Sequence, residues 1–372
     1  MNIYHLINVK TLTYNWNIIS TIPEFAKLKE CQQSTKWHSE GTAWDHTKLV
    51  CEEAVKLCES EKLNDTASML LMASALFHDI GKGETTIFKK DDWHSYGHEV
   101  ASEKITRRLL WDDGYEVREP ICALVRWHME PIFIFNNKSY IDRILSLSKD
   151  IPSWYLLLLL KRCDIMGSHP SDMSTRDAEL LKLDDISTIT TKLGCYYKPS
   201  TIPYKHKLSH NIKGNGKKSI NVHVLIGLPG AGKSTAINDI LNTFNGPYFV
   251  VSRDIARVEL GFCKDGEKYL GTPTEEEQVT EKCVELIETA AALGETIIID
   301  NTNLKRKYRD GYKNVLSDYN VTWYYDYVEA STIGTNISRR KGEVSEETIV
   351  NMTRGFEWPQ TDEYDYIKYY KN

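Results

Sequence analysis

The stretch Ser219–Thr235, which reads SINVHVLIGLPGAGKST, constrains the fold of this chain more than any other part of the sequence. A short apolar run ends at Gly227, and the residues after it follow the spacing G-x-x-x-x-G-K-[ST]. In that spacing the glycines let backbone N–H groups surround one anion, Lys233 places a charge beside the outer phosphates, and the hydroxyl of Ser234 can ligate magnesium. The alternative is an ordinary Gly-rich turn, but strand, loop and helix all fall where a site for ATP or another nucleoside triphosphate with Mg2+ requires them. The residues expected to contact the nucleotide and its ion are Gly227, Gly230, Gly232, Lys233, Ser234 and Thr235.

The composition is that of an ordinary globular protein, and the length of 372 residues favours two domains. The net charge of −6 excludes a global basic field, so any nucleic-acid substrate would depend on local Lys/Arg clusters. The eight cysteines are scattered and predict reduced thiols in a cytoplasmic protein. The start of the chain lacks the pattern of a signal peptide, and its longest apolar run, Trp154–Leu160, is too short to cross a membrane.

The first half of the sequence predicts an all-α domain over residues 1–195, because helical periodicity dominates from Trp37 to about Leu193. A segment rich in Pro, Gly and Lys at 196–218 predicts a linker, whose lysines and tyrosines could alternatively follow a nucleic-acid backbone. The P-loop domain would then occupy 219–372. The helices expected in the first half are Asn15–Leu28 with an interruption at Pro23, Asp45–Cys58, Thr66–Phe77, His98–Leu110, Glu119–Trp127 and Ser139–Asp164.

Within this helical half, His46, the pair His78-Asp79 and Asp164 form a set of candidate metal ligands. A single buried histidine is usually structural, and a single aspartate near a helix end is usually a cap. Four such residues in the order H…HD…D on successive helices indicate a metal site instead. Imidazole nitrogen with carboxylate oxygen suits zinc, manganese, iron, cobalt or nickel better than calcium.

The same residues, followed by Gly81-Lys82, resemble the HD-domain metal-dependent phosphohydrolases. The text HDIGKGETT…WHSYGHEVASEKI is especially similar to the HD domain attached to bacterial tRNA nucleotidyltransferases. The resemblance implies a helical core whose four motif residues hold a metal that activates water for attack on a phosphoester. Lys82 lies one turn after Asp79 and would either reach a substrate phosphate or remain a solvated lysine.

Three further histidines are candidates for the same site. In two-metal members of the HD family, histidines between the doublet and the last aspartate hold a second ion, and His98 and His128 resemble that arrangement. His94 is a candidate for the substrate side or for the second metal, and on a helix it would share a face with His98. Each of these histidines could instead bind phosphate or simply lie on the surface. The site would therefore hold one or two divalent transition metals.

The second half alternates strands with helices, which predicts an α/β domain with a parallel sheet flanked by helices. The expected strands are Val222–Ile226, Tyr248–Ser252, Glu295–Asp300 and Val321–Val328, and the expected helices beyond the P-loop helix are Thr274–Leu293 and Leu304–Ser317. In such sheets the site lies at the carboxyl ends of the strands. The polar residues that directly follow a strand, and are therefore expected to line the site, are Asp254, Arg257, Asp300, Asn301 and Asn303.

The P-loop together with SRDIAR, DNTN and SRRKGEVSEETI resembles the polynucleotide 5′-hydroxyl kinases. By that resemblance Asp254 is the general base, Arg257 holds the phosphate next to the accepting end, and Arg339 or Arg340 acts from a lid. A helix cap, a salt bridge and a basic helix face are the structural alternatives for these residues. The family often reads Asp-Thr-Asn where this chain reads Asp300-Asn301-Thr302-Asn303, so either Asn301 replaces the carboxylate or Asp300 takes its role.

The order of the two halves resembles the bacterial bifunctional HD-domain polynucleotide kinases. This implies repair of RNA or DNA ends, in which the kinase phosphorylates a 5′-OH and the HD domain removes a 3′-phosphate or a 2′,3′-cyclic phosphate. No ligase-type K-x-D-G motif is present, so sealing would fall to a separate ligase. Two alternatives stay open, namely a small-molecule kinase fused to a nucleotide phosphohydrolase and an NTP-gated RNA-binding module with a structural HD site.

Overall fold

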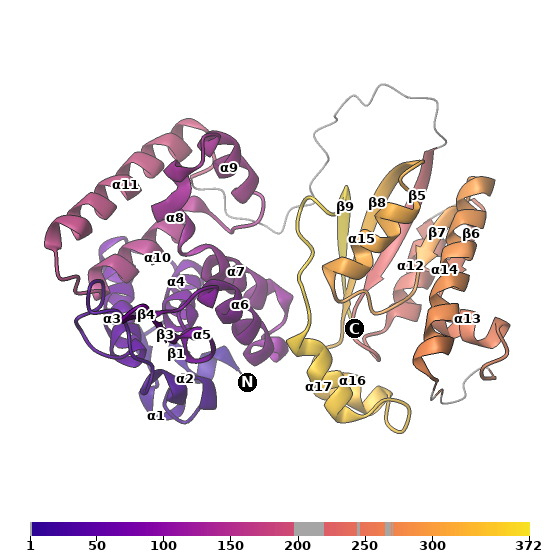
Figure 1. The fold of residues 1–372 in the computed structure, drawn as a ribbon, viewed down its shortest axis with the longest axis horizontal. Helices are drawn as coiled ribbons and strands as arrows, with labels where there is room; N and C mark the ends of the chain where they lie inside the picture. Colours follow the sequence, from indigo (N-terminus) through magenta and orange to yellow (C-terminus); the bar gives the residue numbers. More distant parts are fainter. Residues whose placement is uncertain (1, 197–218, 244–245, 265–268, 270) are drawn as a thin grey trace. The chain divides into compact units, whose positions relative to one another are not determined.

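The computed structural model describes residues 2–196, 219–243, 246–264, 269 and 271–372 (Figure 1). The chain divides into two compact units, Met1–Pro203 and Tyr204–Asn372. Of the predicted linker at 196–218, only Tyr196 belongs to the described residues, and its carbonyl accepts a hydrogen bond from the backbone of Tyr155 at 3.0 Å.

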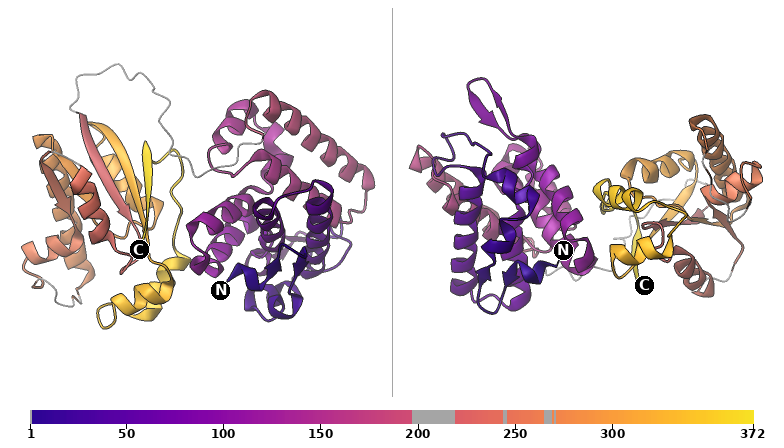
Figure 2. Two further views of the ribbon diagram at one scale, coloured as in Figure 1. Left: turned by 180° about the vertical axis from the view of Figure 1, so that it is seen from behind. Right: turned by 90° about the horizontal axis from the view of Figure 1, so that it is seen from below.

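The core of the first unit is a group of helices that pack around an apolar interior (Figures 1 and 2). Helix α4 (Asp65–Phe77) is buried along most of its length, as is α10 (Trp154–Gly167), and both pack against α3 (Ala43–Ser60) and α7 (Tyr115–Trp127). None of the described helices has the length and apolar character needed to cross a bilayer. The other helices of this unit are α1 (Trp16–Ile19), α2 (Pro23–Leu28), α5 (Lys82–Thr85), α6 (His98–Leu109), α8 (Glu130–Phe133), α9 (Tyr140–Leu147) and α11 (Met173–Lys192).

Short side-chain caps explain where the main helices begin. Thr42 and Asp45 form a reciprocal capping box at the start of α3, so the first free N–H groups of that helix are satisfied. Pro152 prevents the preceding helix from continuing, and Ser153, the next residue, caps the start of α10. The single helix expected over 139–164 is therefore wrong in its length, because the structure divides it into α9 and α10.

Two hairpins interrupt the otherwise helical unit, and the sequence did not predict them. They are β1 (Ile7–Asn8) with β2 (Thr13–Tyr14), and β3 (Ile87–Lys89) with β4 (Asp92–His94). Lys90 and Asp91 form the two-residue turn between β3 and β4, and both have positive φ, at 52° and 61°. Such a turn is normally signalled by Asn-Gly or Asp-Gly, so Lys-Asp gives little warning of it. His94 consequently ends a strand and shares no helix face with His98.

The second unit contains a five-stranded, entirely parallel sheet in the order β6-β7-β5-β8-β9, flanked by helices, which confirms the predicted fold class. The central strand is β5 (Ser219–Ile226), which leads into the Gly-rich loop. The last strand, β9, pairs with β8 at the edge of the sheet and was not predicted. The other elements are β6 (Tyr248–Val251), β7 (Thr296–Ile299), β8 (Asn320–Glu329), β9 (Tyr366–Lys371), α12 (Lys233–Thr243), α13 (Arg253–Glu259), α14 (Pro273–Leu293), α15 (Arg306–Val315), α16 (Ile333–Arg339) and α17 (Glu346–Arg354).

A fully buried ion pair ties α15 to the segment before β9. The guanidinium of Arg309 donates to both carboxylate oxygens of Glu363, with N–O distances of 2.7 and 3.1 Å, and also to the carbonyl of Asn303 at 3.0 Å. Both charged side chains are inaccessible to solvent. Because Arg309 also bonds to Asn303, the pair holds the segment between β7 and α15 in place.

Replacing Glu363 by Ala should lower the free energy of unfolding of the second unit by about 3 to 5 kcal/mol, because the guanidinium of Arg309 would stay buried without its carboxylate. The matched control is Asp362→Ala, which removes a solvent-exposed pair with Arg306 at 2.7 Å. That control should cost at most about 1 kcal/mol. Urea unfolding of the whole chain, followed by far-UV circular dichroism, compares the two, and equal losses would contradict this role.

Candidate active sites

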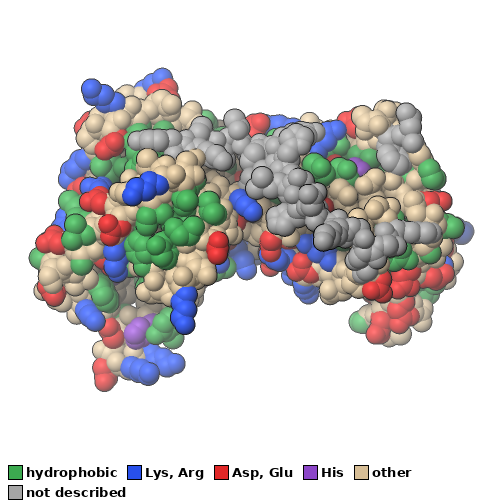
Figure 3. Space-filling view, turned by 90° about the horizontal axis from the view of Figure 1, so that it is seen from above, with side chains coloured by type: hydrophobic (Ala, Val, Ile, Leu, Met, Phe, Trp, Pro, Cys, Tyr) green, Lys and Arg blue, Asp and Glu red, His purple; other side chains and the backbone are tan. Residues whose placement is uncertain are grey.

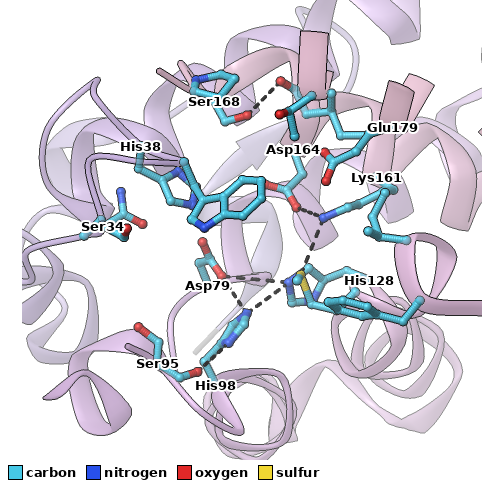
Figure 4. A pocket seen from close by; sticks show the side chains of 18 of the residues that line it. Ser34, His38, Asp79, Ser95, His98, His128, Lys161, Asp164, Ser168 and Glu179 are labelled. Atoms are coloured by element: carbon cyan, nitrogen blue, oxygen red, sulfur yellow. Dashed lines mark hydrogen bonds and ion pairs between the residues drawn. The ribbon is translucent and has the colours of Figure 1, made fainter. Parts of the chain in front are cut away.

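The first unit brings six predicted metal-ligand candidates from five helices or helix ends to one place, and Figure 4 shows four of them, Asp79, His98, His128 and Asp164. His46 lies on the first turns of α3, and Asp164 lies on α10. His78 and His128 are the residues that end α4 and α7, and His98 begins α6. Asp79 follows α4, and its carboxylate lies at the centre of the cluster.

The inner group of the cluster joins His46, His78, Asp79 and Asp164. Nε2 of His46 lies 3.0 Å from Oδ1 of Asp164, 3.4 Å from Nε2 of His78 and 3.6 Å from Oδ2 of Asp79. Nε2 of His78 lies 3.2 Å from the same Oδ2 of Asp79. The structure thus gathers the four residues of the H…HD…D pattern within contact distance of one another.

The outer group uses the other oxygen of the same carboxylate. Oδ1 of Asp79 lies 3.2 Å from Nε2 of His98 and 3.8 Å from Nε2 of His128, and these two nitrogens are 3.3 Å apart. Asp79 therefore belongs to both groups, with Oδ2 facing the inner imidazoles and Oδ1 facing the outer ones.

Hydrogen bonds to backbone carbonyls fix the tautomers of three of these histidines. Nδ1 of His78, His98 and His128 lies 2.7–2.8 Å from a carbonyl oxygen of the residue three positions earlier. A carbonyl only accepts, so each Nδ1 carries a proton, and a ring that is neutral has its lone pair at Nε2. With the proton on Nδ1, Nε2 of each of these three rings in its neutral form is a hydrogen-bond acceptor, and it lies beside the oxygens of Asp79, which are acceptors too.

This donor set fits one or two divalent cations. Oδ1 of Asp79 is buried and has no hydrogen-bond donor among the described residues, so its charge lacks a partner of the usual kind. Burial lowers the pKa of His128 well below its ordinary value, helped by His78 and His98, which keeps this imidazole neutral and ready to ligate. Imidazole nitrogen with carboxylate oxygen is the chemistry of transition-metal sites.

The pKa values of the inner group also reflect mutual attraction. Burial favours a neutral Asp79, but electrostatic attraction by the neighbouring His78 and Lys82 holds the pKa of its carboxyl well below the usual range. Burial disfavours a charged His46, but the carboxylates of Asp164 and Glu40, at 3.0 and 2.9 Å from its ring nitrogens, raise its pKa to about 9.

The glycine after the doublet permits the close packing that forms the outer group. A Cβ built on Gly81 would lie 2.5 Å from both the carbonyl of His98 and the backbone nitrogen of Ser102. The N–H of Gly81 also donates to the hydroxyl of Ser102 at 2.9 Å. Only glycine lets the chain after Asp79 approach α6 this closely, which brings His98 to Asp79.

Two buried lysines complete the electrostatics of the cluster. Nζ of Lys82 lies 2.6 Å from Oδ2 of Asp79 and 2.8 Å from Gln33, so Lys82 is not the solvated lysine of the alternative interpretation. Nζ of Lys161 lies 2.6 Å from Oδ2 of Asp164. The sequence analysis missed Lys161, although its position three residues before Asp164 on a helix was a usable signal.

A pair of residues before α3 supports His46 from behind, and it was also missed. Oε1 of Glu40 lies 2.9 Å from Nδ1 of His46 and 2.7 Å from Nδ1 of His38. A carboxylate in this position orients the ring of His46 so that Nε2 points toward Asp164. Nothing in the spacing of Glu40 distinguishes it from a surface glutamate.

The cluster opens into a pocket of about 610 Å³ (Figure 4). Asp79, His98, His128, Lys161 and Asp164 lie on its wall. His94 also lines this pocket, but its Nε2 bonds to the carbonyl of Lys89 at 3.1 Å, and the residue does not belong to either metal-ligand group.

The second candidate site lies at the carboxyl end of β5, in a cleft of about 570 Å³. A Cβ on Gly227 would lie 2.4 Å from the carbonyl of Val328, and Gly230 and Gly232 have φ values of 75° and 100°. These three positions therefore require glycine. The ammonium of Lys233 lies 3.3 Å from the carbonyls of Gly227 and Leu228, and Ser234 lines the cleft, whereas the side chain of Thr235 is exposed.

Helix α13 brings Asp254 and Arg257 to the same cleft. The carboxylate of Asp254 is 86% exposed and pairs with Nη1 of Arg257 at 2.6 Å. Nε and Nη2 of Arg257 bond to Glu276 of α14 at 2.9 and 3.1 Å. Glu276 thus holds the guanidinium of Arg257 in place, and another edge of the same guanidinium faces Asp254. The sequence analysis did not predict the role of Glu276.

The segment after β7 separates three residues that were expected to act together. Asp300 lines the cleft, and its Oδ1 is buried and has no hydrogen-bond partner among the described residues. Burial raises the pKa of Asp300, while Lys233 acts in the opposite direction. Asn301 also lines the cleft and accepts a bond from the backbone N–H of Arg253 at 3.0 Å. Asn303, an expected substrate-binding residue, instead donates to the carbonyl of Leu225 at 2.7 Å, is buried, and is absent from the cleft wall.

Both candidate lid arginines reach the cleft from α16 and its end. Nη1 of Arg339 donates to the carbonyl of Gly230 at 3.1 Å, and Arg340 pairs with Glu343 at 2.5 Å. The charge of Arg340 also acts on Lys233 and on Asp300.

Comparisons with known proteins agree with this division of the chain. The sequence profile described as HD domain matches residues 43–167, and the profile described as AAA domain matches residues 222–359. The Multifunctional CCA protein of Pasteurella multocida (strain Pm70) is 38% identical over 87 residues, 23% of this chain and 20% of that protein. A protein of Autographa californica nuclear polyhedrosis virus, named "Putative bifunctional polynucleotide kinase/RNA ligase", is 28% identical over 163 residues, 41% of this chain and 22% of that protein. The chain thus spans about a fifth of the length of these relatives.

Solved structures give weaker similarities. The structure of a Pnkp1/Rnl/Hen1 complex matches with a TM-score of 0.30 and 21% identity, over 36% of this chain and 42% of that one. A gluconokinase from Sinorhizobium meliloti 1021 also matches with a TM-score of 0.30, at 17% identity, over 41% of this chain and 82% of that one. The family profiles, the metal-ligand cluster and the P-loop lead to one conclusion: this chain joins an N-terminal HD domain to a C-terminal P-loop kinase domain.

Proposed function

We propose that this chain heals the ends of broken polynucleotides. The P-loop domain would transfer phosphate from ATP or another NTP to a 5′-OH end, and the HD domain would remove a 3′-phosphate or a 2′,3′-cyclic phosphate. One observation carries the proposal: a single chain combines a cation-ready cluster around Asp79 with a P-loop cleft that holds a carboxylate and an arginine, Asp254 and Arg257. The name of the viral relative, which pairs a polynucleotide kinase with an RNA ligase, supports a polynucleotide acceptor and a separate ligase as partner.

In the kinase site the residues have distinct tasks. Lys233 and the loop N–H groups would hold the donor phosphates, and Ser234 would hold Mg2+ together with the buried carboxylate of Asp300 rather than with Asn301. Asp254 would accept the proton of the 5′-OH while the hydroxyl oxygen bonds to the γ-phosphorus and the bond to the β–γ bridging oxygen breaks. Arg257, fixed by Glu276, would position the acceptor strand, and Arg339 or Arg340 would neutralise the transferring phosphoryl group.

In the HD site the inner and outer groups would each hold one divalent ion, with Asp79 shared. Bound ions would supply an acidified water and would offset negative charge on the phosphoryl group. Lys161 pairs with the carboxylate of Asp164, and Lys82 pairs with that of Asp79. Both lysines line the pocket, so their charges favour an anionic substrate there. His94, at the pocket wall, would contact the substrate rather than an ion.

The experiment that tests the proposal gives the whole protein an oligonucleotide with a 5′-OH and a 3′-phosphate, together with ATP and a panel of divalent ions. We expect phosphate to be gained at the 5′ end and lost at the 3′ end. A protein that phosphorylates nucleosides or sugars but no oligonucleotide would contradict the proposal.

Salt dependence separates a polynucleotide acceptor from a small one. Between about 50 and 200 mM salt the KM for an oligonucleotide acceptor should rise by about tenfold, because a bound strand releases counterions. The KM for ATP, measured in the same assays, serves as the internal control. Equal salt dependence for both substrates would favour the small-molecule alternative.

Substitutions at the metal ligands should separate the two ions. Asp79→Ala should remove both bound divalent ions and abolish 3′-end hydrolysis, because Asp79 belongs to both groups. His128→Ala should remove only the outer ion. Elemental analysis of the purified variants measures this, and His5→Ala, an exposed histidine outside the pocket, is the matched control. Loss of 5′ phosphorylation in a folded Asp79→Ala protein would show that the two activities are not separate.

Asp254→Asn should lower kcat for 5′ phosphorylation by about 10²- to 10⁴-fold, because the amide cannot accept the proton of the hydroxyl. The KM for ATP should change little. Glu259→Gln changes an exposed carboxylate on the same helix and should retain full activity. Unchanged kcat in the Asp254→Asn variant would assign this carboxylate to its structural alternative, a salt bridge with Arg257.

A further inference from the structure

The β3–β4 hairpin and the residues after it carry an unusual density of aromatic rings. Phe88, Trp93, His94 and Tyr96 lie within nine consecutive residues. The hairpin projects away from the helices of its unit, as the right-hand view of Figure 2 shows. No role in the metal cluster accounts for these side chains, because none of them belongs to either ligand group.

The rings form two ordered pairs. Phe88 and Trp93 lie directly opposite each other in the strand register, with ring centroids 5.1 Å apart in an edge arrangement. His94 and Tyr96 stack with centroids 5.2 Å apart and planes 8° from parallel. Phe88 is 59% exposed, Trp93 36% and Tyr96 70%. A cluster of exposed aromatic rings, unlike scattered apolar residues, indicates a surface that binds something.

This aromatic surface is continuous with the HD pocket. Trp93, His94 and Tyr96 line the same cavity of about 610 Å³ as Asp79 and Lys161. A ligand whose terminal phosphate lies at the cluster would therefore extend its preceding residues across these rings. An elongated ligand could contact both the cluster and the rings of the hairpin, whereas a compact ligand at the cluster would not reach the rings.

The charges beside the rings suit a phosphate backbone. Lys89 and Lys90 at the tip of the hairpin are exposed, and within the described residues neither forms an ion pair with an acid. Asp91 at the same tip offsets one charge, and Asp92 accepts a bond from Ser34 at 2.6 Å. Figure 3 shows the hairpin at the lower left, where hydrophobic, basic, acidic and His side chains lie together.

Helix α11 adds two more cations to the lining of the pocket. Arg176 and Lys182 both line it, and neither forms an ion pair in the part of the chain that the structure describes. Glu179 lies between them on the same helix. A strand in the pocket would thus meet basic side chains from α11 in addition to those of the hairpin.

We propose that Phe88, Trp93 and Tyr96 form a stacking platform for the bases that precede the 3′ end of a single-stranded polynucleotide. This inference rests on the proposed function, since it names the part of the substrate that the HD site grips. Stacking on aromatic side chains tolerates any base, because every base offers a π-face. The platform would therefore favour unpaired 3′ ends of any sequence over mononucleotides.

The test compares two substrates in the whole protein. One is an oligonucleotide with a 3′-phosphate, and the other is p-nitrophenyl phosphate, which has no preceding base. Trp93→Ala should lower kcat/KM for the oligonucleotide at least about tenfold more than for p-nitrophenyl phosphate. Trp93→Phe, which keeps a ring, should restore most of the difference. Ile87→Ala is the matched control, because Ile87 is an exposed apolar residue of the same hairpin that does not line the pocket.

A binding measurement keeps this inference separate from the proposed hydrolysis. Fluorescence of an oligonucleotide with 2-aminopurine next to its 3′-phosphate reports stacking even if the end is never hydrolysed. Weaker binding and less quenching in Trp93→Ala than in Ile87→Ala would support the platform. Equal losses on both substrates would show a structural hairpin, and no loss in either assay would show a surface for another partner; both outcomes overturn the proposal.

Discussion

The first unit depends on one electrostatic constraint, the crowding of acceptor atoms around Asp79. Backbone carbonyls hold the protons of His78, His98 and His128 on Nδ1, so their lone pairs converge on each other and on a carboxylate. Acceptors that face acceptors in a buried place repel one another, and a cation turns that repulsion into attraction. The helix ends, the close approach at Gly81 and the burial of the cluster all serve to hold this arrangement.

In the second unit the corresponding constraint is topological. Strand β5 lies between β7 and β8. The Gly-rich loop after β5 is therefore flanked by the segments that follow β7 on one side and β8 on the other. The cleft therefore receives Asp254 from one side of the sheet and Arg339 from the other. Asn303 has a positive φ of 47° and bonds across to Leu225, which fixes the turn that carries Asp300 into the cleft. The buried Arg309–Glu363 pair holds that turn from outside the site.

The candidate sites could be predicted from the sequence where a pattern of residues has few explanations other than a ligand site. The P-loop spacing and the H…HD…D order could be found because glycines at fixed intervals and histidines that end apolar helices are rare without a ligand. Lys161 and Glu40 were missed because their value comes from packing against Asp164 and His46, and no spacing encodes such packing. The β3–β4 hairpin was missed because its turn reads Lys-Asp and lacks the glycine of the usual Asn-Gly or Asp-Gly signal.

The two sites balance charge in opposite ways, which bears on how they divide the chemistry. Around Asp79 the carboxylates are buried, and the two lysines of the pocket wall, Lys82 and Lys161, are already paired with Asp79 and Asp164. In the P-loop cleft the cations Lys233, Arg339 and Arg340 are already present, and the carboxylate of Asp254 is exposed to whatever enters. Arg257 pairs with both Glu276 and Asp254, so in the proposed kinase reaction an acceptor phosphate would compete with these carboxylates for its guanidinium. On that proposal, an acceptor that makes further contacts with the protein, as a strand would, has an advantage over a free sugar.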